Sequence, residues 1–480
     1  MATAQKPAGA GSAPRFEIDA KRLDELDRKH KLPGFASPTE HAEKGPLIIA
    51  RGKGVFVWDA SGKQYLDGSS AIWNVNLGFG NKEIADAVAH QLETLSFHLG
   101  LLNISTPPAI ELAAKLASLA PPGLDRVFFT SGGSESNESV IRLTRLYQRL
   151  RGFKNKTVAI ARIKGYHGSS CGAASLTGID HFHEFFEPML PDVRHIAPPY
   201  CYRCPLGKEY PSCAVACADE LEKAILAEGP DRVAFFIAEP VMGAGGVIPA
   251  PKEYWTRIRE ICDKYDVLMV ADEVITGAGR TGKMFACEHW DVRPDIIVCA
   301  KGISSGYLPL GAVIVHQRIY QTLLDSAAGA AVWHGFTNTG NPACCAAGLK
   351  TLEIMERDGV VENSRRMGER LHQRLQELRS SPIVGEIRGV GLMAGVELVR
   401  NPRTREAFPE ALGVGAHFRD VAREQGLLIR AVGDTVCMSP PLIITAREID
   451  QLIDKLKSAL AETESWLAGQ NQQGPDGKNG

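Results

Sequence analysis

The chain has 480 residues, of which 44% are hydrophobic and 23% charged, and its formal net charge is −2. Because this length exceeds one ordinary hydrophobic core, we expect two domains or one large α/β domain. The near-neutral charge argues against nucleic acid or an anionic membrane as a partner, and no apolar run approaches the roughly 18 residues of a membrane span.

The N-terminus and the cysteines indicate a cytoplasmic protein. MATAQKPAGAGSAPR lacks the apolar core of a signal peptide. The 11 cysteines are odd in number and scattered, which suits a reducing compartment better than a disulfide framework. Residues 1–14 and the tail 467–480 are rich in small and polar residues, so we expect both to be disordered.

The first predicted element is a hairpin over GVFVWDASGKQYLD (54–67). Short, apolar, β-branched runs then alternate with helical patterns. Such runs are typical of strands covered on both faces, and helices between them predict a mainly parallel sheet. The predicted strands are 126–131, 156–163, 232–241, 267–274, 295–301 and 310–315. The first is followed by a helix over 134–150, with Ser134 or Ser131 as its N-cap.

The pattern changes near residue 343. Helices are predicted over 342–357 and 361–379, followed by strands near GLMAGVEL and GLLIRAV. We therefore predict a large domain over 71–342 and a smaller α+β domain over 343–466. The segment 15–70 is expected to pack with the smaller domain.

The stretch GAGRTGK (277–283) resembles two nucleotide-binding motifs. A phosphate loop of the Walker type needs Ser or Thr after the lysine, but residue 284 is Met. A dinucleotide fingerprint should follow its strand directly and open a helix. We therefore interpret these residues as a glycine-rich turn.

GSSCG (168–172) matches the nucleophile elbow of serine hydrolases. Ser170 would be the nucleophile, and His334 is the best candidate for its base. The acid and the histidine must come later in the chain, and no histidine stands in a suggestive context, so the hydrolase remains the weaker alternative.

Two strand ends carry charged residues that could share a ligand. Asp272 ends an apolar strand, where a buried charge needs a partner such as a cationic cofactor ring. Lys301 ends the next strand, where a depressed pKa and Schiff-base chemistry are possible. Taken singly, a loop-capping Asp and a surface Lys are the commoner interpretations.

Further polar groups follow other strands. In TSGGSESNES (130–139), the glycines and the helix start favour a bound phosphate. Tyr166 in KGYHG could lie flat on a planar ring. Thr337 in HGFTNTGNP could hold a phosphate oxygen.

Together these motifs resemble the class III aminotransferases, which are pyridoxal-phosphate enzymes of fold type I. The resemblance covers about residues 35–465 and is closest to the ω-amino acid:pyruvate branch, which includes taurine–, β-alanine– and amine–pyruvate transaminases. It implies a large domain with a mainly parallel seven-stranded sheet plus a smaller α+β domain. The motifs that carry it include SGGSESNE, GYHG, IAEPV, ADEVITGAGRTGKMFA, AKGISSGYLPLGA and GLLIRAVGDTVCMSPPL.

The resemblance implies a role for individual residues. Lys301 would form the internal aldimine, and Asp272 would pair with the pyridine nitrogen. The other implied cofactor contacts are Val274 and Tyr166 on the two ring faces, Glu239 near the phenolic side, and Gly133, Ser134 and the neighbouring subunit's Thr337 at the phosphate. Trp73, Tyr166 and Arg430 would contact substrate, with Arg430 binding a carboxylate.

Two departures from the family pattern bear on these roles. The usual phosphate loop carries a serine where this chain has Gly132, so one hydroxyl is lost. Leu101 and Leu102 stand where many relatives carry aromatic residues, which affects the size and shape of the substrate pocket.

The implied reaction moves an amino group from an ω-amino acid or primary amine to a keto acid, with pyruvate expected, in two stages that give ping-pong kinetics. A homodimer, or a tetramer, with sites at the subunit interface is also implied. A decarboxylase or aminomutase on the same fold is the nearer alternative, and the residues do not name the amine donor.

A cysteine cluster stands apart from these motifs. Cys201, Cys204, Cys213 and Cys217 follow the spacing C-x2-C-x8-C-x3-C. Four thiolates could bind structural zinc, but the middle gap is short and the aminotransferase chemistry needs no metal. We expect a structural loop without metal and keep zinc as the alternative.

Overall fold

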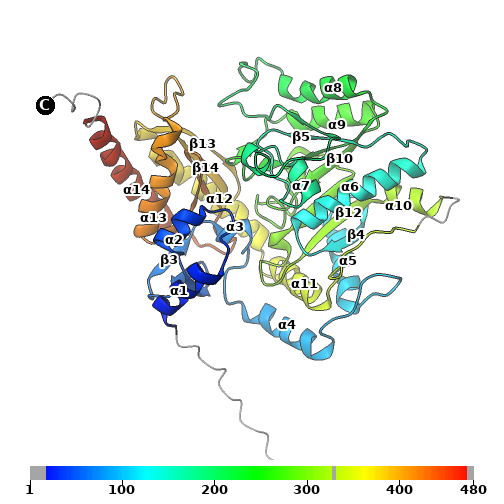
Figure 1. Ribbon diagram of the computed structural model, residues 1–480, viewed down its shortest axis with the longest axis horizontal. Coiled ribbons are helices and arrows are strands. Elements are labelled where there is room, and N and C mark those ends of the chain that lie inside the picture. Colours follow the sequence, from blue (N-terminus) through cyan, green and yellow to red (C-terminus); the bar gives the residue numbers. More distant parts are fainter. Residues whose placement is uncertain (1–17, 327–330, 473–480) are drawn as a thin grey trace, which may run out of the picture.

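The computed structural model describes residues 18–326 and 331–472 (Figure 1). The predicted disordered N-terminus, residues 1–14, lies outside the described residues. Within the described ranges, no helix is long and apolar enough to cross a membrane.

A seven-stranded sheet lies at the centre of the larger body, in the order β4-β12-β11-β10-β7-β5-β6. β12 runs antiparallel to both its neighbours, and the other pairings are parallel, so the predicted mainly parallel sheet is confirmed. The strands are β4 (Leu124–Thr130), β5 (Val158–Arg162), β6 (Val193–Ile196), β7 (Val233–Ala238), β10 (Leu268–Asp272), β11 (Ile296–Ala300) and β12 (Gly311–His316).

Successive side chains along each strand point in opposite directions, so the sheet contributes to two hydrophobic cores. In β11, Ile297 and Cys299 face one core, whereas Ile296 and Val298 face the other, as the two-residue repeat of a strand requires. The first core includes α5 (Pro107–Leu119) and α11 (Pro342–Arg357), and the second includes α6 (Gly133–Leu150). Burial on both faces explains why these strands are almost wholly apolar.

Further helices surround this sheet (Figure 1). α8 and α9 pack together beside β6 and β10. The remaining elements of this body are α4 (Lys82–Thr94), α7 (Cys171–Leu176), α8 (Ala216–Glu228), α9 (Tyr254–Lys264), α10 (Gln317–Leu324), the pair β8 (Val241–Met242) and β9 (Ile248–Pro249), and the short 3-10 helices η1 (Asp180–Phe182), η2 (Ala286–Trp290) and η3 (Lys301–Ile303).

A second body contains two four-stranded sheets, seen beside α12, α13 and α14 in Figure 1. One is antiparallel, in the order β13-β14-β17-β16, and the other has the order β1-β2-β3-β15. Their strands are β13 (Val384–Val390), β14 (Met393–Leu398), β16 (Arg430–Val432), β17 (Thr435–Met438), β1 (Ile49–Lys53), β2 (Phe56–Asp59), β3 (Gln64–Asp67) and β15 (Leu427–Leu428).

The helices of this second part come from both ends of the chain. They are α1 (Ala20–His30), α2 (Pro38–Lys44), α3 (Ser70–Trp73), α12 (Val360–Leu375), α13 (Val414–Glu424) and α14 (Ala446–Gln472), with the 3-10 helices η4 (Gln376–Ser380) and η5 (Glu410–Leu412). The predicted hairpin is present as β2 and β3. β3 also pairs with β15, so the N-terminal segment shares a sheet with a C-terminal strand. The domain boundaries at residues 70 and 342 stay a prediction.

The last helix corrects one expectation from the sequence. α14 continues to Gln472, whereas the disordered tail was predicted from residue 467. Leu467 is buried, and this apolar contact supports a further turn of helix beyond Trp466. Residues 473–480 lie outside the described residues.

Candidate active site

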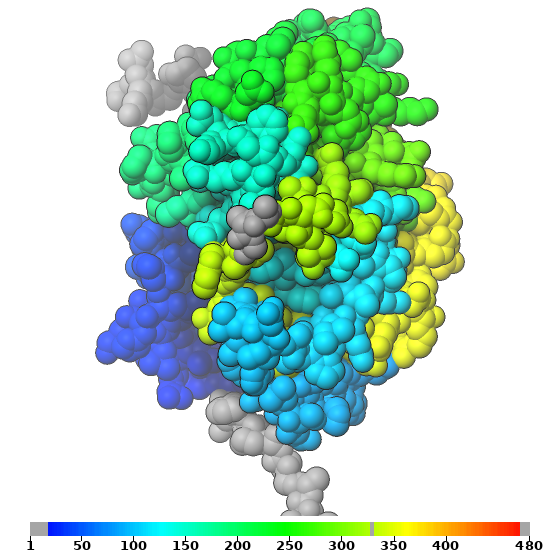
Figure 2. Space-filling view, turned by 90° about the vertical axis from the view of Figure 1, so that its right-hand side faces the viewer, coloured from blue at the N-terminus to red at the C-terminus, as the bar shows by residue number. Residues whose placement is uncertain are grey.

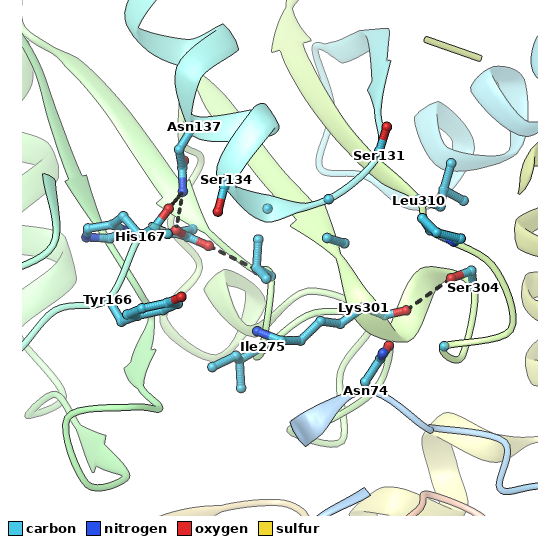
Figure 3. Close-up of a pocket in the computed structure, with 18 of the residues that line it drawn as sticks. Asn74, Ser131, Ser134, Asn137, Tyr166, His167, Ile275, Lys301, Ser304 and Leu310 are labelled. Atoms are coloured by element: carbon cyan, nitrogen blue, oxygen red, sulfur yellow. Dashed lines mark hydrogen bonds and ion pairs between the residues drawn. The ribbon is translucent and has the colours of Figure 1, made fainter. Parts of the chain in front are cut away.

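A cavity of about 330 Å³ opens at the carboxyl ends of β10 and β11, where ligands bind in open α/β sheets (Figure 3). Seven of the predicted site residues line it: Gly133, Ser134, Tyr166, Glu239, Asp272, Val274 and Lys301. Residues from four strand ends and one helix start therefore converge on one cavity. Its size suits a small cofactor.

Asp272 is buried at this cavity and is held by three donors. One carboxylate oxygen accepts the Nδ2–H of Asn137 at 2.9 Å and lies 2.7 Å from Nδ1 of His167. The other oxygen accepts the backbone N–H of Val274 at 3.1 Å. These contacts fix the carboxylate while leaving its charge available to a cationic partner.

Asn137 and His167 were not assigned a role from the sequence. Asn137 lies in the helix that follows the predicted phosphate loop, and His167 follows Tyr166 directly. Their separations from Asp272 are 135 and 105 residues, so only the fold reveals the contacts. The sequence offered one signal for these two residues: each is polar and lies next to a motif that was predicted to bind the cofactor.

Lys301 begins η3 directly after β11, and its side chain extends into the cavity toward Tyr166 and His167 (Figure 3). Its backbone φ is 46°, a left-handed conformation that is rare for a non-glycine residue and that occurs at functional sites. Burial lowers the pKa of the amine to about 8, against the opposing pull of the Asp272 and Glu239 carboxylates. A neutral amine is therefore accessible near physiological pH.

The helix α6 opens onto the cavity at Gly133. A Cβ on Gly133 would lie 3.1 Å from the Val274 side chain, so the close packing there favours glycine. First-turn amides have no intrahelical acceptor. In the described chain, no other acceptor bonds to the N–H groups of Gly133 and Ser134. This helix start is therefore free to bind an anion.

The predicted N-cap, Ser134 or Ser131, is wrong. Gly132 occupies the N-cap position and no side chain caps the helix. Instead, the carboxylate of Glu135 accepts the N–H of Ser131 at 2.8 Å. Gly132 at the N-cap and Gly133 at the first helical position thus keep side chains away from the free amides.

Glu239 joins two walls of the cavity. Its carboxylate accepts the N–H of Tyr166 at 3.0 Å and the N–H of Gly243 at 2.8 Å. Burial raises the pKa of this carboxyl group. The ring of Tyr166 rests on Phe182, with 5.3 Å between the ring centroids, which restrains its orientation.

Arg430 and Trp73 come from the second body and are not among the residues that line the cavity. The Arg430 guanidinium lies over the Trp73 ring, 4.6 Å from its centroid. Burial lowers the pKa of Arg430, and its charge acts on Lys301 and Tyr166. Within the described ranges Arg430 forms no salt bridge with a carboxylate, so the cation is available to an anionic ligand.

Thr337 lies away from the cavity of its own chain and is exposed. Near it, a second hollow is lined by Leu101, Leu102, Glu138, Arg142 and residues 332–336. Figure 2 shows this side of the molecule, where the yellow-green segment after residue 330 lies beside cyan and blue segments. Trp333 is 82% exposed and Leu102 is 80% exposed, which makes this face unusually apolar.

The GSSCG motif does not assemble a nucleophile with its base. The Ser170 hydroxyl is buried without a hydrogen-bond partner, and His334 bonds to Ser139 at 2.8 Å instead. The serine-hydrolase alternative therefore lacks its base.

The GAGRTGK stretch is a turn, as predicted, with positive φ at Gly279 and Gly282. Arg280 makes the main side-chain contacts of this turn. Its guanidinium is fully buried and donates to Asn76 at 2.8 Å and to Ser70 at 3.1 Å. It also donates to the carbonyl of Pro440. The turn thus connects the larger body to segments of the second body.

Comparisons with known proteins agree with this geometry. A family model described as aminotransferase class-III matches residues 38–460. A putrescine–pyruvate aminotransferase of Pseudomonas aeruginosa is 42% identical over 91% of this chain and 95% of its own length. A diaminobutyrate–2-oxoglutarate transaminase of Halomonas elongata is 37% identical over 91% of this chain and 96% of its own length. The crystal structure of the ω-transaminase from Pseudomonas jessenii in complex with PMP has a TM-score of 0.91 and 40% identity, over 93% of this chain and 99% of that one.

Proposed function

Because this chain belongs to the class-III aminotransferase family, we propose that it transfers an amino group from an ω-amino acid or primary amine to pyruvate. The enzyme is an aminotransferase with the fold type I architecture, and its cofactor is pyridoxal 5'-phosphate. We propose two half-reactions with ping-pong kinetics, as expected when the amino group is carried covalently by the enzyme between them.

The residues of the cavity fit this cofactor. The free amides of Gly133 and Ser134 would hold its phosphate, and Asp272 would pair with its ring nitrogen. Val274 and Tyr166 would flank the ring, with Glu239 near its phenolic side. When bound, the cofactor supplies an electron sink for the substrate carbon.

Lys301 would hold and move the proton. Its amine extends into the cavity. Because the pKa of this amine is lowered, it can accept a proton from the substrate carbon as a general base and then donate that proton to a different atom as a general acid. Asp272, fixed by His167 and Asn137, would keep the opposite end of the cavity anionic.

We expect covalent uptake of pyridoxal phosphate by the apoprotein to speed up as pH rises through about 8. Carbonyl attack needs the neutral amine, and a pKa lowered to about 8 means that this form predominates above that pH. Stopped-flow absorbance between about pH 6 and 10 would measure the rate. A midpoint near about 10, the value of a solvated lysine, would contradict the assignment.

The observation that carries the substrate class is the Arg430 guanidinium, stacked on Trp73 and near Lys301. A cation with no carboxylate partner in the described chain suits a substrate carboxylate, as in pyruvate. The two relatives named above act with pyruvate and with 2-oxoglutarate. Both acceptors carry the carboxylate that Arg430 would bind.

We expect Arg430→Ala to lower kcat/KM for pyruvate about 10–100-fold, the effect of losing hydrogen bonds to a charged group. The half-reaction with 1-phenylethylamine, which has no carboxylate, should change little. Arg51→Ala is the matched control, because Arg51 lies 4.3 Å over the Trp58 ring but is exposed and outside the cavity. Equal losses for both substrates would count against a carboxylate site.

A donor screen completes this test. β-Alanine, taurine, 4-aminobutyrate, putrescine and 1-phenylethylamine would be compared, each with pyruvate and with 2-oxoglutarate. Alanine formed from pyruvate at the higher rate would support the proposed acceptor. If glutamate formed from 2-oxoglutarate at the higher rate, 2-oxoglutarate rather than pyruvate would be the acceptor.

We also propose a homodimer in which Thr337 reaches the neighbouring site. Thr337 is exposed and lies away from the cavity of its own chain, beside the apolar Trp333. Leu101 and Leu102 border the same hollow. A second copy on this face would bury these side chains and bring Thr337 to the other cofactor's phosphate.

A further inference from the structure

The four cysteines of the C-x2-C-x8-C-x3-C stretch lie together in the fold. Cys201, Cys204, Cys213 and Cys217 all line one small cavity between β6 and α8. The cavity measures about 10 Å³, so it has space for at most one water molecule. The four cysteines therefore border one small space that is too small for a bulky ligand.

The arrangement does not match a metal site. Within residues 18–326 and 331–472, no group of three or more His, Cys, Asp and Glu side chains is arranged to hold a metal ion. None of the four forms a disulfide in the structure. Thiols that border one cavity can be joined by oxidation if their sulfurs come within bonding distance.

The loop that carries these thiols is attached to the second body. Tyr200 donates to the carboxylate of Glu397, and Nε of Arg203 donates to the same carboxylate at 2.5 Å. Arg405 donates to the carbonyl of Tyr202 at 2.9 Å. Glu397 lies on β14, in the sheet whose edge strand β16 carries Arg430. A bond within the loop would therefore restrain a connection between the two bodies.

We propose that Cys201 and Cys213 are a reversible redox site, closing a disulfide under peroxide and reopening with a thiol reductant. Cys201 is exposed and accessible to an oxidant, whereas Cys217 is buried in the core formed with α8 and α9. Cys213 lines the same cavity as Cys201 and is half-buried, in the segment that precedes α8. The bond would close the loop of chain between Cys201 and Cys213, which border the same cavity.

The step balances with hydrogen peroxide as the oxidant. The Cys201 thiolate attacks one peroxide oxygen, giving a sulfenic acid and hydroxide, which takes up the released proton as water. The Cys213 sulfur then attacks the Cys201 sulfur and expels the second water. Two electrons pass from the two sulfurs to peroxide, leaving one S–S bond and two waters.

The groups around Cys201 determine the pH at which its oxidation should be tested. Although Cys201 is exposed at the surface, partial desolvation of its thiol raises the pKa, and the neighbouring Cys213 and Cys204 thiols and Glu386 add to the shift. Lys208 and Tyr210 also line the cavity. The thiolate is therefore scarce at neutral pH, and oxidation should be run at about pH 8.5.

The holoenzyme would be treated with hydrogen peroxide, alkylated, and mapped by peptide mass spectrometry without reduction. We expect a Cys201–Cys213 cross-link, loss of about two reactive thiols per chain, and recovery of both with dithiothreitol. Cys201→Ser and Cys213→Ser should each remove this cross-link. Cys171→Ser is the matched control, because Cys171 is an exposed thiol outside the cluster, and it should leave the cross-link intact.

Three outcomes would overturn the proposal. The first is a cross-link that joins other cysteines in the wild type. The second is oxidation of Cys201 to the sulfinic acid without any cross-link. The third is stoichiometric zinc in the purified protein that protects the thiols until a chelator is added. None of these readouts uses amino transfer, so they stand apart from the test of the proposed function.

Discussion

The Lys301→Ala enzyme should transfer no amino groups at a practical rate, with a loss on the order of 10⁴-fold, the upper end for one acid–base group. Of the residues that line the cavity, Lys301 alone carries an amine. Its removal takes away both the covalent attachment of the cofactor and the group that moves the proton. Steady-state turnover of 1-phenylethylamine with pyruvate would measure the loss.

The control for this substitution is Lys283→Ala. Lys283 is an exposed lysine in the GAGRTGK turn and is not among the cavity residues, so its loss should leave turnover unchanged. Circular dichroism of both variants would establish that they fold. Turnover by Lys301→Ala within about tenfold of the parent enzyme, against the expected range for such a group, would refute the assignment.

Asp272→Asn should lower kcat on the order of 10²–10³-fold, the range for one electrostatic contact in a site shielded from water. Asparagine nearly preserves the size of the side chain and can still accept the N–H of Val274. It removes the negative charge that would hold the cofactor's ring nitrogen in its protonated form. The absorption spectrum of the bound cofactor should change together with kcat.

A graded series separates the charge from its support. His167→Gln removes the contact between the imidazole and Asp272 but keeps the carboxylate, so we expect a smaller loss of about tenfold. The cofactor spectrum should then resemble that of the parent enzyme. If His167→Gln were as damaging as Asp272→Asn, the charge of Asp272 would not be the deciding feature.

The central part of this site could be predicted because parallel strands end at one edge of a sheet. Asp272 and Lys301 both follow apolar runs, and β10 and β11 are neighbours in the observed sheet. The edge strand β6 was missed, because VRHI is half polar and only its last residue is buried. Amphipathic pattern alone does not identify so short a strand.

Other contacts depend on segments far apart in the chain. Arg280 sits in a glycine-rich turn, and its sequence context gave no sign that its guanidinium is buried against Ser70, Asn76 and Pro440. The N-cap prediction failed for a local reason, because Glu135 rather than a serine bonds to the backbone before the helix. In both cases the result depended on which backbone or side-chain group the Arg280 or Glu135 side chain contacts. Residue type alone does not determine that partner.

The pairing of β3 with β15 has a consequence for how the protein is made. Leu66 pairs with Leu427, so a sheet begun near the N-terminus is completed only when nearly the whole polypeptide has left the ribosome. Trp73 follows that sheet within a few residues, and Arg430 follows β15 just as closely. The two sides of the proposed carboxylate site therefore come together late in biosynthesis, after translation has passed both of them.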